Sequence, residues 1–147
     1  MTTSVDKERT LFTLSARAVY GLTAVVELSC RGEHGPVQIR DIAGAHGIPQ
    51  HYLEQILVAL KKAGIVASVR GAQGGYSLAR PPEAIGIGEV LAALDGKLEL
   101  VREGRRDGSL SFYWDRLEGV LGKALGGTIQ ELVLEVQHAK GQLNYSI

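Results

Sequence analysis

Hydrophobic positions recur with a helical period through residues 36–62 and define two successive helices. The second of these, which begins near Pro49, buries one face made of Leu53, Ile56, Leu57 and Leu60, spaced i, i+3, i+4 and i+7. The first directs Ile39, Ile42 and Ala43 inward. Residues 44–47, a short stretch with a glycine at each end, are expected to form the turn between them. The pattern predicts a helix-turn-helix.

After Gly64 the pattern becomes that of β-strands. Residues 65–69 and 76–78 are short extended runs on either side of a glycine-rich tip, residues 70–75 (RGAQGG). Three glycines in six residues allow close approach of the backbone to another surface. No Gly-Lys-Ser/Thr opens a helix here, which excludes a nucleotide-binding phosphate loop. We therefore predict a mainly α fold with a small β-hairpin wing, a winged helix-turn-helix that commonly binds DNA.

The flanking segments extend this domain. A helix is predicted from Leu14 with Ser15 as its cap, and another over residues 87–94, closed by Asp95 and Gly96. We assign residues 11–96 to the winged domain and residues 1–10 to a flexible tail. Residues 97–109, charged and interrupted by glycine, are predicted to be an exposed loop.

Residues 110–147 are predicted to hold a dimerisation helix followed by a terminal helix. The seam of the first helix, spaced alternately by four and three residues, consists of Leu110, Trp114, Leu117 and Leu121. Thr128 and Glu131 form a capping box that opens the terminal helix. A second copy of the chain is the expected partner of the seam, and packing against the chain's own winged domain is the alternative.

Charge and composition restrict the class of protein. The formal net charge is zero, but residues 1–80 carry nine Lys/Arg against six Asp/Glu, and the rest carries seven against ten. The positive excess lies with the winged domain, as expected for a DNA-binding face. A single cysteine excludes an internal disulfide framework and fits a reducing compartment. No signal peptide or membrane span is recognisable, so a cytoplasmic protein is expected.

If the winged domain binds double-stranded DNA, the start of its second helix enters a major groove. Gln50 and His51 are then expected at base edges, Tyr52 at a phosphate or sugar, and Arg70 at a phosphate or in the adjacent minor groove. The same fold can instead serve as a protein–protein interaction module. Catalysis is not expected, because no nucleophile–base–acid set and no cofactor loop is present.

Three segments carry a family resemblance: LSARAVYGLTAVVEL, HGIPQHYLEQILVALKKAGIVASVRGAQGGYSLAR and IGIGEVLAALDG. They resemble the IscR/NsrR/CymR family of bacterial winged-helix transcription regulators, often called the Rrf-two type. The resemblance implies a homodimeric repressor of pseudo-palindromic promoter sites, with a small metabolite or a metabolic enzyme as its effector. With it, the candidate DNA-binding residues are Arg17, Gln38, Gln50, His51, Tyr52, Glu54, Arg70, Gly71, Gln73 and Gly74.

Many members of that family hold an iron–sulfur cluster through three cysteines between the winged domain and the dimerisation helix. Residues 97–109 contain no cysteine, and Ser111 stands near the position of a further histidine ligand. Because such clusters need thiolates, the chain resembles the cluster-free branch, and no cofactor is predicted.

Cys30 is the one candidate for a redox or iron–sulfur sensing role, on the expectation that neighbouring Arg31 lowers its pKa. The alternative is a small, partly buried residue with no role. The four histidines lack the spacing of a zinc site, so no metal is predicted.

Overall fold

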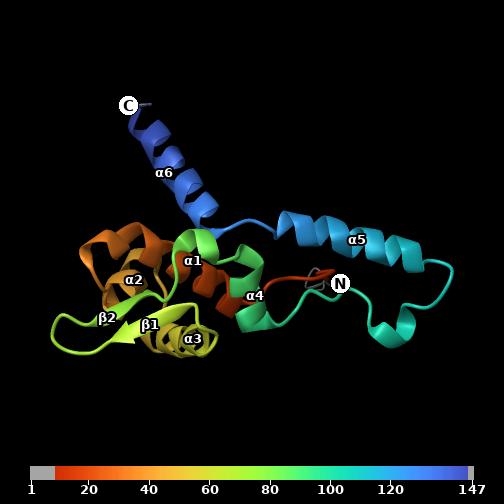
Figure 1. Ribbon diagram of the computed structural model, residues 1–147, viewed down its shortest axis with the longest axis horizontal. Helices are drawn as coiled ribbons and strands as arrows, with labels where there is room; N and C mark the ends of the chain where they lie inside the picture. Colours follow the sequence, from red (N-terminus) through yellow and green to blue (C-terminus); the bar gives the residue numbers. More distant parts are fainter. Residues whose placement is uncertain (1–8, 146–147) are drawn as a thin grey trace, which may run out of the picture.

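The computed structural model describes residues 9–145, and most of the predicted tail therefore lies outside the described residues. Its elements are α1 (Ala16–Arg31), α2 (Ile39–His46), α3 (Gln50–Lys62), β1 (Val66–Val69), β2 (Gly75–Leu78), α4 (Ile87–Asp95), α5 (Ser111–Ala124) and α6 (Ile129–Tyr145). Helices α1 to α4 and the β1–β2 hairpin form one body, from which α5 and α6 project (Figure 1). The predicted fold class, mainly α with a hairpin wing, is confirmed.

The core forms where α3 packs against α1 and α4. The four predicted face residues of α3 are all fully buried, and α1 contributes Ala24, Val25 and Leu28 to the same cluster. Ser15 caps α1 as predicted, since its hydroxyl accepts a hydrogen bond from the Ala18 N–H at 3.0 Å. The Ser15 N–H and hydroxyl both donate to Asp95 at the end of α4, which fastens the two helices together.

The turn between α2 and α3 is shorter than predicted. Gly44 remains helical, and α2 continues to His46. Gly47 leaves the helix with φ 63°, a left-handed conformation that glycine adopts without strain, and its N–H bonds the carbonyl of Ala43. The prediction of a turn beginning at Gly44 was wrong, because an isolated glycine does not end a helix whose neighbours supply packing.

The hairpin is tied to the helices by main-chain and side-chain bonds. Val37, just before α2, forms a bridge with Tyr76 of β2 through two N–H···O bonds of 2.8 Å. Lys61 of α3 donates to the Ser68 hydroxyl of β1 at 2.7 Å. Arg80, after the hairpin, donates to the Gly64 and Ala84 carbonyls and to Glu89, so it acts as a structural brace.

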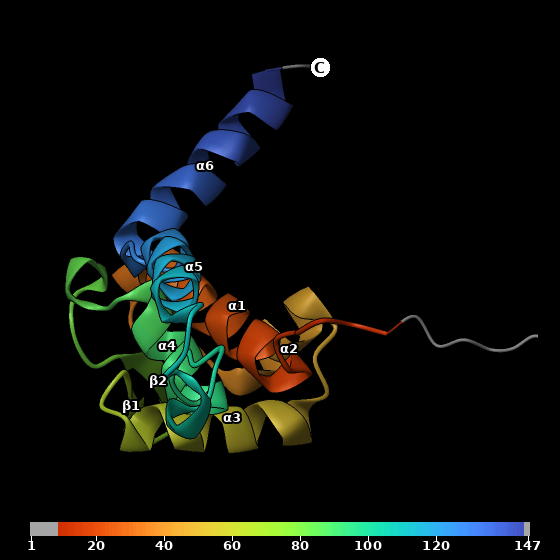
Figure 2. The same ribbon diagram turned by 90° about the vertical axis from the view of Figure 1, so that its right-hand side faces the viewer.

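The two C-terminal helices differ in their relation to the body. Ile129 and Val133 at the base of α6 are buried in the core, and the Ile129 N–H donates to the Ile85 carbonyl at 2.9 Å. Helix α5 has no buried residue and extends away from the body, while α6 lies at a steep angle to α5 (Figures 1 and 2). The division at residue 110 stays a prediction, although the base of α6 belongs to the core. Within residues 9–145, no helix is long and apolar enough to cross a membrane.

Two glycines provide a matched test of this packing. A Cβ at Gly21 would lie 2.1 Å from Leu94 Cδ1 of α4, whereas a Cβ at Gly44 meets nothing within 4 Å. We expect Gly21→Ala to lower the free energy of unfolding by about 1–3 kcal/mol through overpacking. Gly44→Ala should raise it by about 0.5–1 kcal/mol, because alanine is the better helix former. Urea unfolding measures the free energy of unfolding of each variant. Equal values for Gly21→Ala and Gly44→Ala would contradict a tight contact between α1 and α4.

Candidate nucleic-acid interface

The face of α3 opposite the core is exposed and mostly polar. It carries His51, Glu54, Gln55, Val58 and Lys62, all exposed. The Gln55 amide nitrogen lies 3.5 Å from His51 Nε2, one turn away, which links two of the side chains. The predicted candidates His51 and Glu54 therefore share one surface. Gln55 and Val58 were not among the predicted site residues, although the helical period that buries Leu53 and Ile56 places them opposite.

Tyr52 does not share that surface. Its ring is half-buried and packs edge-on against Tyr20 of α1, with ring centroids 5.8 Å apart. The ring also lies against the core cluster. The ring of Tyr52 therefore anchors α3 to α1, and the contact of Tyr52 with a phosphate or sugar stays a prediction. Its position on the flank of the helix, between the two faces, left both roles open in the sequence.

A shallow groove separates the start of α3 from the wing. Its lining includes Gln38 just before α2, Arg40 from α2, Gln50 from α3, and Gly71 and Gly74 from the wing. Three elements thus bring together predicted residues that are distant in the sequence. Arg40 is exposed here and was missed as a site residue, although its outward position in α2 was recognisable.

The shape of the wing tip depends on its glycines. Gly71 has φ 108°, and a Cβ at Gly74 would lie 2.2 Å from the Val69 carbonyl oxygen. Gly75 approaches Val37 so closely that a Cβ would lie 2.4 Å from its carbonyl oxygen. Arg70 and Gln73 are exposed on this tip. No hydrogen bond or ion pair joins Arg70 to another of the described residues, so its guanidinium is available to a phosphate.

Arg17 lies elsewhere. It is exposed in the first turn of α1, on the side of Asp95 at the end of α4. The hydrogen bonds from Ser15, and to a smaller extent the charge of Arg17, lower the pKa of Asp95. The structure does not bring Arg17 together with the residues that line the groove.

Helix α5 exposes more apolar side chains than its predicted seam. Leu110 precedes the helix and is 50% exposed, while Trp114, Leu117 and Leu121 are half-buried. The apolar side chains most exposed on the helix itself are Phe112, Tyr113 and Val120, which the seam pattern did not include. Because no other helix within residues 9–145 packs along α5, this apolar surface is left uncovered by the described part of a single chain.

The loop before α5 is held to that helix by ion pairs. Arg106 binds Asp115 at 2.7 Å and also binds Glu118, which accepts the Leu100 N–H at 3.1 Å. Burial alone would raise the pKa of Glu118, but the hydrogen bonds from Arg106 and Leu100 lower it. Most of residues 97–109 are exposed as predicted, yet Arg106 is committed to the helix and is not free for phosphate.

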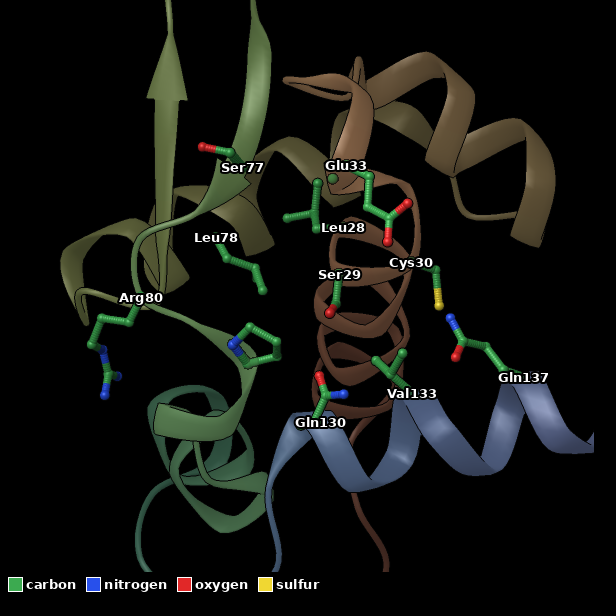
Figure 3. A pocket seen from close by; sticks show the side chains of 12 residues that line it. Leu28, Ser29, Cys30, Glu33, Ser77, Leu78, Arg80, Gln130, Val133 and Gln137 are labelled. Atoms are coloured by element: carbon green, nitrogen blue, oxygen red, sulfur yellow. The ribbon is translucent and has the colours of Figure 1, made fainter.

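Cys30 sits at the edge of a cavity of about 450 Å³ between the end of α1, the exit of β2 and α6 (Figure 3). Burial, and then the charge of Glu27, raise the pKa of the Cys30 thiol. Arg31 is paired with Glu27, which also lies 3.0 Å from His46 Nε2. The expectation that Arg31 lowers the pKa of Cys30 was wrong, because the positive charge of Arg31 is paired with Glu27. The cavity is large enough for a small metabolite.

No three His, Cys, Asp or Glu side chains in the described part of the chain are grouped as metal ligands. The only thiol, Cys30, lies in α1, away from residues 97–109. Iron–sulfur clusters need several thiolates, so the donor set of these residues does not fit one.

An exposed helix beside a glycine wing defines the winged helix-turn-helix class of DNA-binding proteins. The profile of the Rrf2 family, described as an iron-dependent transcriptional regulator, matches residues 14–117. The chain therefore belongs to the Rrf2 family of transcriptional regulators.

Its relatives agree with this assignment. The chain is 40% identical to the HTH-type transcriptional regulator CymR of Bacillus subtilis over 88 residues, which cover 60% of this chain and 64% of CymR. It is 34% identical to IscR of Aliivibrio salmonicida over 141 residues, covering 89% and 84% of the two chains. The expectation of a regulator rather than an enzyme, and the family resemblance, are confirmed.

Solved structures agree as well. The structure of CymR from B. subtilis matches with a TM-score of 0.75 at 33% identity, covering 84% of this chain and 98% of CymR. IscR of T. potens matches with a TM-score of 0.74 at 32% identity, covering 87% and 90%.

The environment of Cys30 predicts slow reaction with alkylating agents at neutral pH, because a raised pKa leaves little thiolate. In Glu27→Gln, the negative charge is removed and Arg31 is released, so the pKa should fall and alkylation by iodoacetamide should quicken. Glu33→Gln, a charge removal that leaves Glu27 in place, is the control. If Glu27→Gln reacts no faster than this control, Glu27 does not govern the thiol.

Proposed function

We propose that this Rrf2-family regulator is a homodimeric repressor that binds pseudo-palindromic promoter DNA. The observation that carries the proposal is the exposed face of α3 standing beside a glycine wing with an unpaired arginine at its tip. An α-helix fits the major groove of B-DNA, and a projecting tip reaches the neighbouring backbone.

The proposed contacts follow from this arrangement. His51 and Glu54, from the exposed face of α3, contact base edges in the major groove of the DNA. Gln50, which lines the shallow groove of the protein between α3 and the wing, contacts the DNA beside them. Arg70 contacts a phosphate or enters the minor groove, and Gln73 adds a polar contact. Gly71, which is exposed, leaves no side chain between the tip and the DNA backbone, and Gly74 keeps the turn of the tip tight because a Cβ there would collide with the Val69 carbonyl. Arg17, exposed one turn before Tyr20 in α1, is proposed to reach a phosphate beside the start of α3, because Tyr20 packs on Tyr52 of that helix.

The homodimer is supported by the uncovered apolar surface of α5. Leu110, Phe112, Tyr113 and Val120 together expose an apolar stretch that a second copy would remove from water. Two-fold symmetry would also present two copies of α3 to two half-sites, which suits a pseudo-palindrome.

We also propose that the protein regulates without an iron–sulfur cluster. The single cysteine, with its raised pKa, and the ion pairs that hold residues 97–109 to α5 support this proposal. For the effector, we favour a small metabolite over a metabolic enzyme. Polar side chains without hydrogen-bond partners among the described residues line the cavity beside Cys30 and could bind such a molecule: Ser29, Gln130 and Gln137.

A salt titration tests the function through Arg70. Arg70→Ala should weaken binding to most duplexes alike and reduce the slope of log affinity against log salt by about one, because one phosphate contact is lost. Arg102→Ala, an exposed arginine in the loop before α5, is the control and should keep the parent slope.

The same titration separates the alternative of a protein–protein interaction module. Affinity for duplex DNA that does not fall with rising salt, in the parent protein, would contradict the proposed function. If the affinity of the parent protein falls with salt and Arg70→Ala has the same slope, DNA binding stands. Only the proposed contact between the wing and a phosphate is then refuted.

The dimer is tested at Val120, whose side chain is 59% exposed on α5. Val120→Glu should convert the dimer to a monomer, because it places a charge within an apolar interface. Val120→Thr, close in shape and uncharged, should remain dimeric. Sedimentation velocity distinguishes the two, and a dimeric Val120→Glu variant would mean that this side of α5 is not the interface.

A further inference from the structure

One apolar side chain stands in the middle of the polar face of α3. Val58 is 45% exposed. It lies one turn after Glu54 and one turn before Lys62, and both of these are exposed on the same side of the helix. The valine is therefore at the centre of the surface proposed to enter the major groove.

The core gives no reason for a valine at this position. Leu53, Ile56, Leu57 and Leu60 complete the buried face of α3, and each is fully buried. Val58 points away from all four, and valine is a weaker helix former than the alanine, lysine or glutamine that an exposed position usually takes. A single exposed apolar residue needs no role by itself. Its place on the proposed reading face is what calls for one.

The major groove offers one apolar group, the C5-methyl of thymine. The neighbours His51, Glu54 and Gln55 can exchange hydrogen bonds with base edges, but Val58 can only make an apolar contact. We propose that Val58 contacts a thymine methyl and so selects thymine at one position of each half-site. This inference rests on the proposed function, since it requires α3 to lie in the major groove.

The geometry of the helix also places that thymine. Val58 follows Glu54 by four residues, or about 6 Å along the helix axis. The duplex rises 3.4 Å per pair along its own axis, and the groove runs obliquely to that axis, so this distance along the groove spans fewer than two base pairs. The thymine should therefore lie within about two pairs of the base contacted by Glu54.

The experiment uses the full chain and a duplex chosen by the protein itself. A binding site is selected from a pool of random duplexes, and each thymine in it is then replaced singly by uracil, which lacks only the methyl group. At one position in each half-site, uracil should weaken binding by about fourfold, the value of one buried methyl group. Uracil at the other thymines should have little effect.

Variants of Val58 assign the effect to this side chain. Val58→Ala should bind the thymine duplex as weakly as the parent binds the uracil duplex, and it should show no further loss with uracil. Val58→Thr keeps one γ-methyl group and should keep part of the discrimination. Since Val58 is outside the core, both variants should keep the circular dichroism spectrum of the parent, which shows that they fold.

The outcomes separate the inference from the function it rests on. If a site is selected but uracil has no effect at any position, or Val58→Ala loses affinity with uracil as the parent does, the thymine contact is refuted and DNA binding stands. If no duplex is selected from the pool, the proposed function fails and the inference fails with it.

Discussion

The burial of one face of α3 against α1 and α4 is the constraint on which the rest of the structure depends. Leu53, Ile56, Leu57 and Leu60 are all removed from water, and each such side chain contributes about 1.5–3 kcal/mol. Because a helix can bury only one face here, the opposite face must point outward. The surface proposed to contact DNA is thus a consequence of the core, and the polar residues there are free to vary with the target without cost to folding.

The wing is fixed to that helix by short-range bonds. The bridge between Val37 and Tyr76 joins the hairpin to the start of α2, and Lys61 joins α3 to Ser68 of β1. Gly75 permits the first of these contacts, because any side chain would collide with the Val37 carbonyl. The separation between α3 and the wing tip is therefore set by one main-chain bridge and one side-chain bond, which suits a surface that must match the fixed spacing of a major and a minor groove.

Local sequence predicted most of the domain, since the buried face of α3, the cap of α1 at Ser15 and the ends of α4 each follow from neighbouring residues. What it missed depends on which elements meet. Tyr52 lies on a flank, and only the position of Tyr20 in α1 decides that its ring turns inward. Arg31 is adjacent to Cys30 in sequence, but burial raises the pKa of the thiol, and Glu27, one turn earlier, pairs with the arginine and raises that pKa further. The groove between Gln38 and the wing required the tertiary arrangement.

The joint between α5 and the winged domain limits how any signal can change the orientation of α3. The N–H groups of Ile87 and Gly88, at the start of α4, donate to the carbonyls of Gly127 and Leu125 at 3.0 and 3.1 Å. Helix α4 packs against α1, which in turn holds α3. A change in the angle of α5 must therefore break these main-chain bonds or carry α4 with it. In a chain whose donor set does not fit a thiolate cluster, this joint and the ion pairs of Arg106 are the contacts that set the angle of α5.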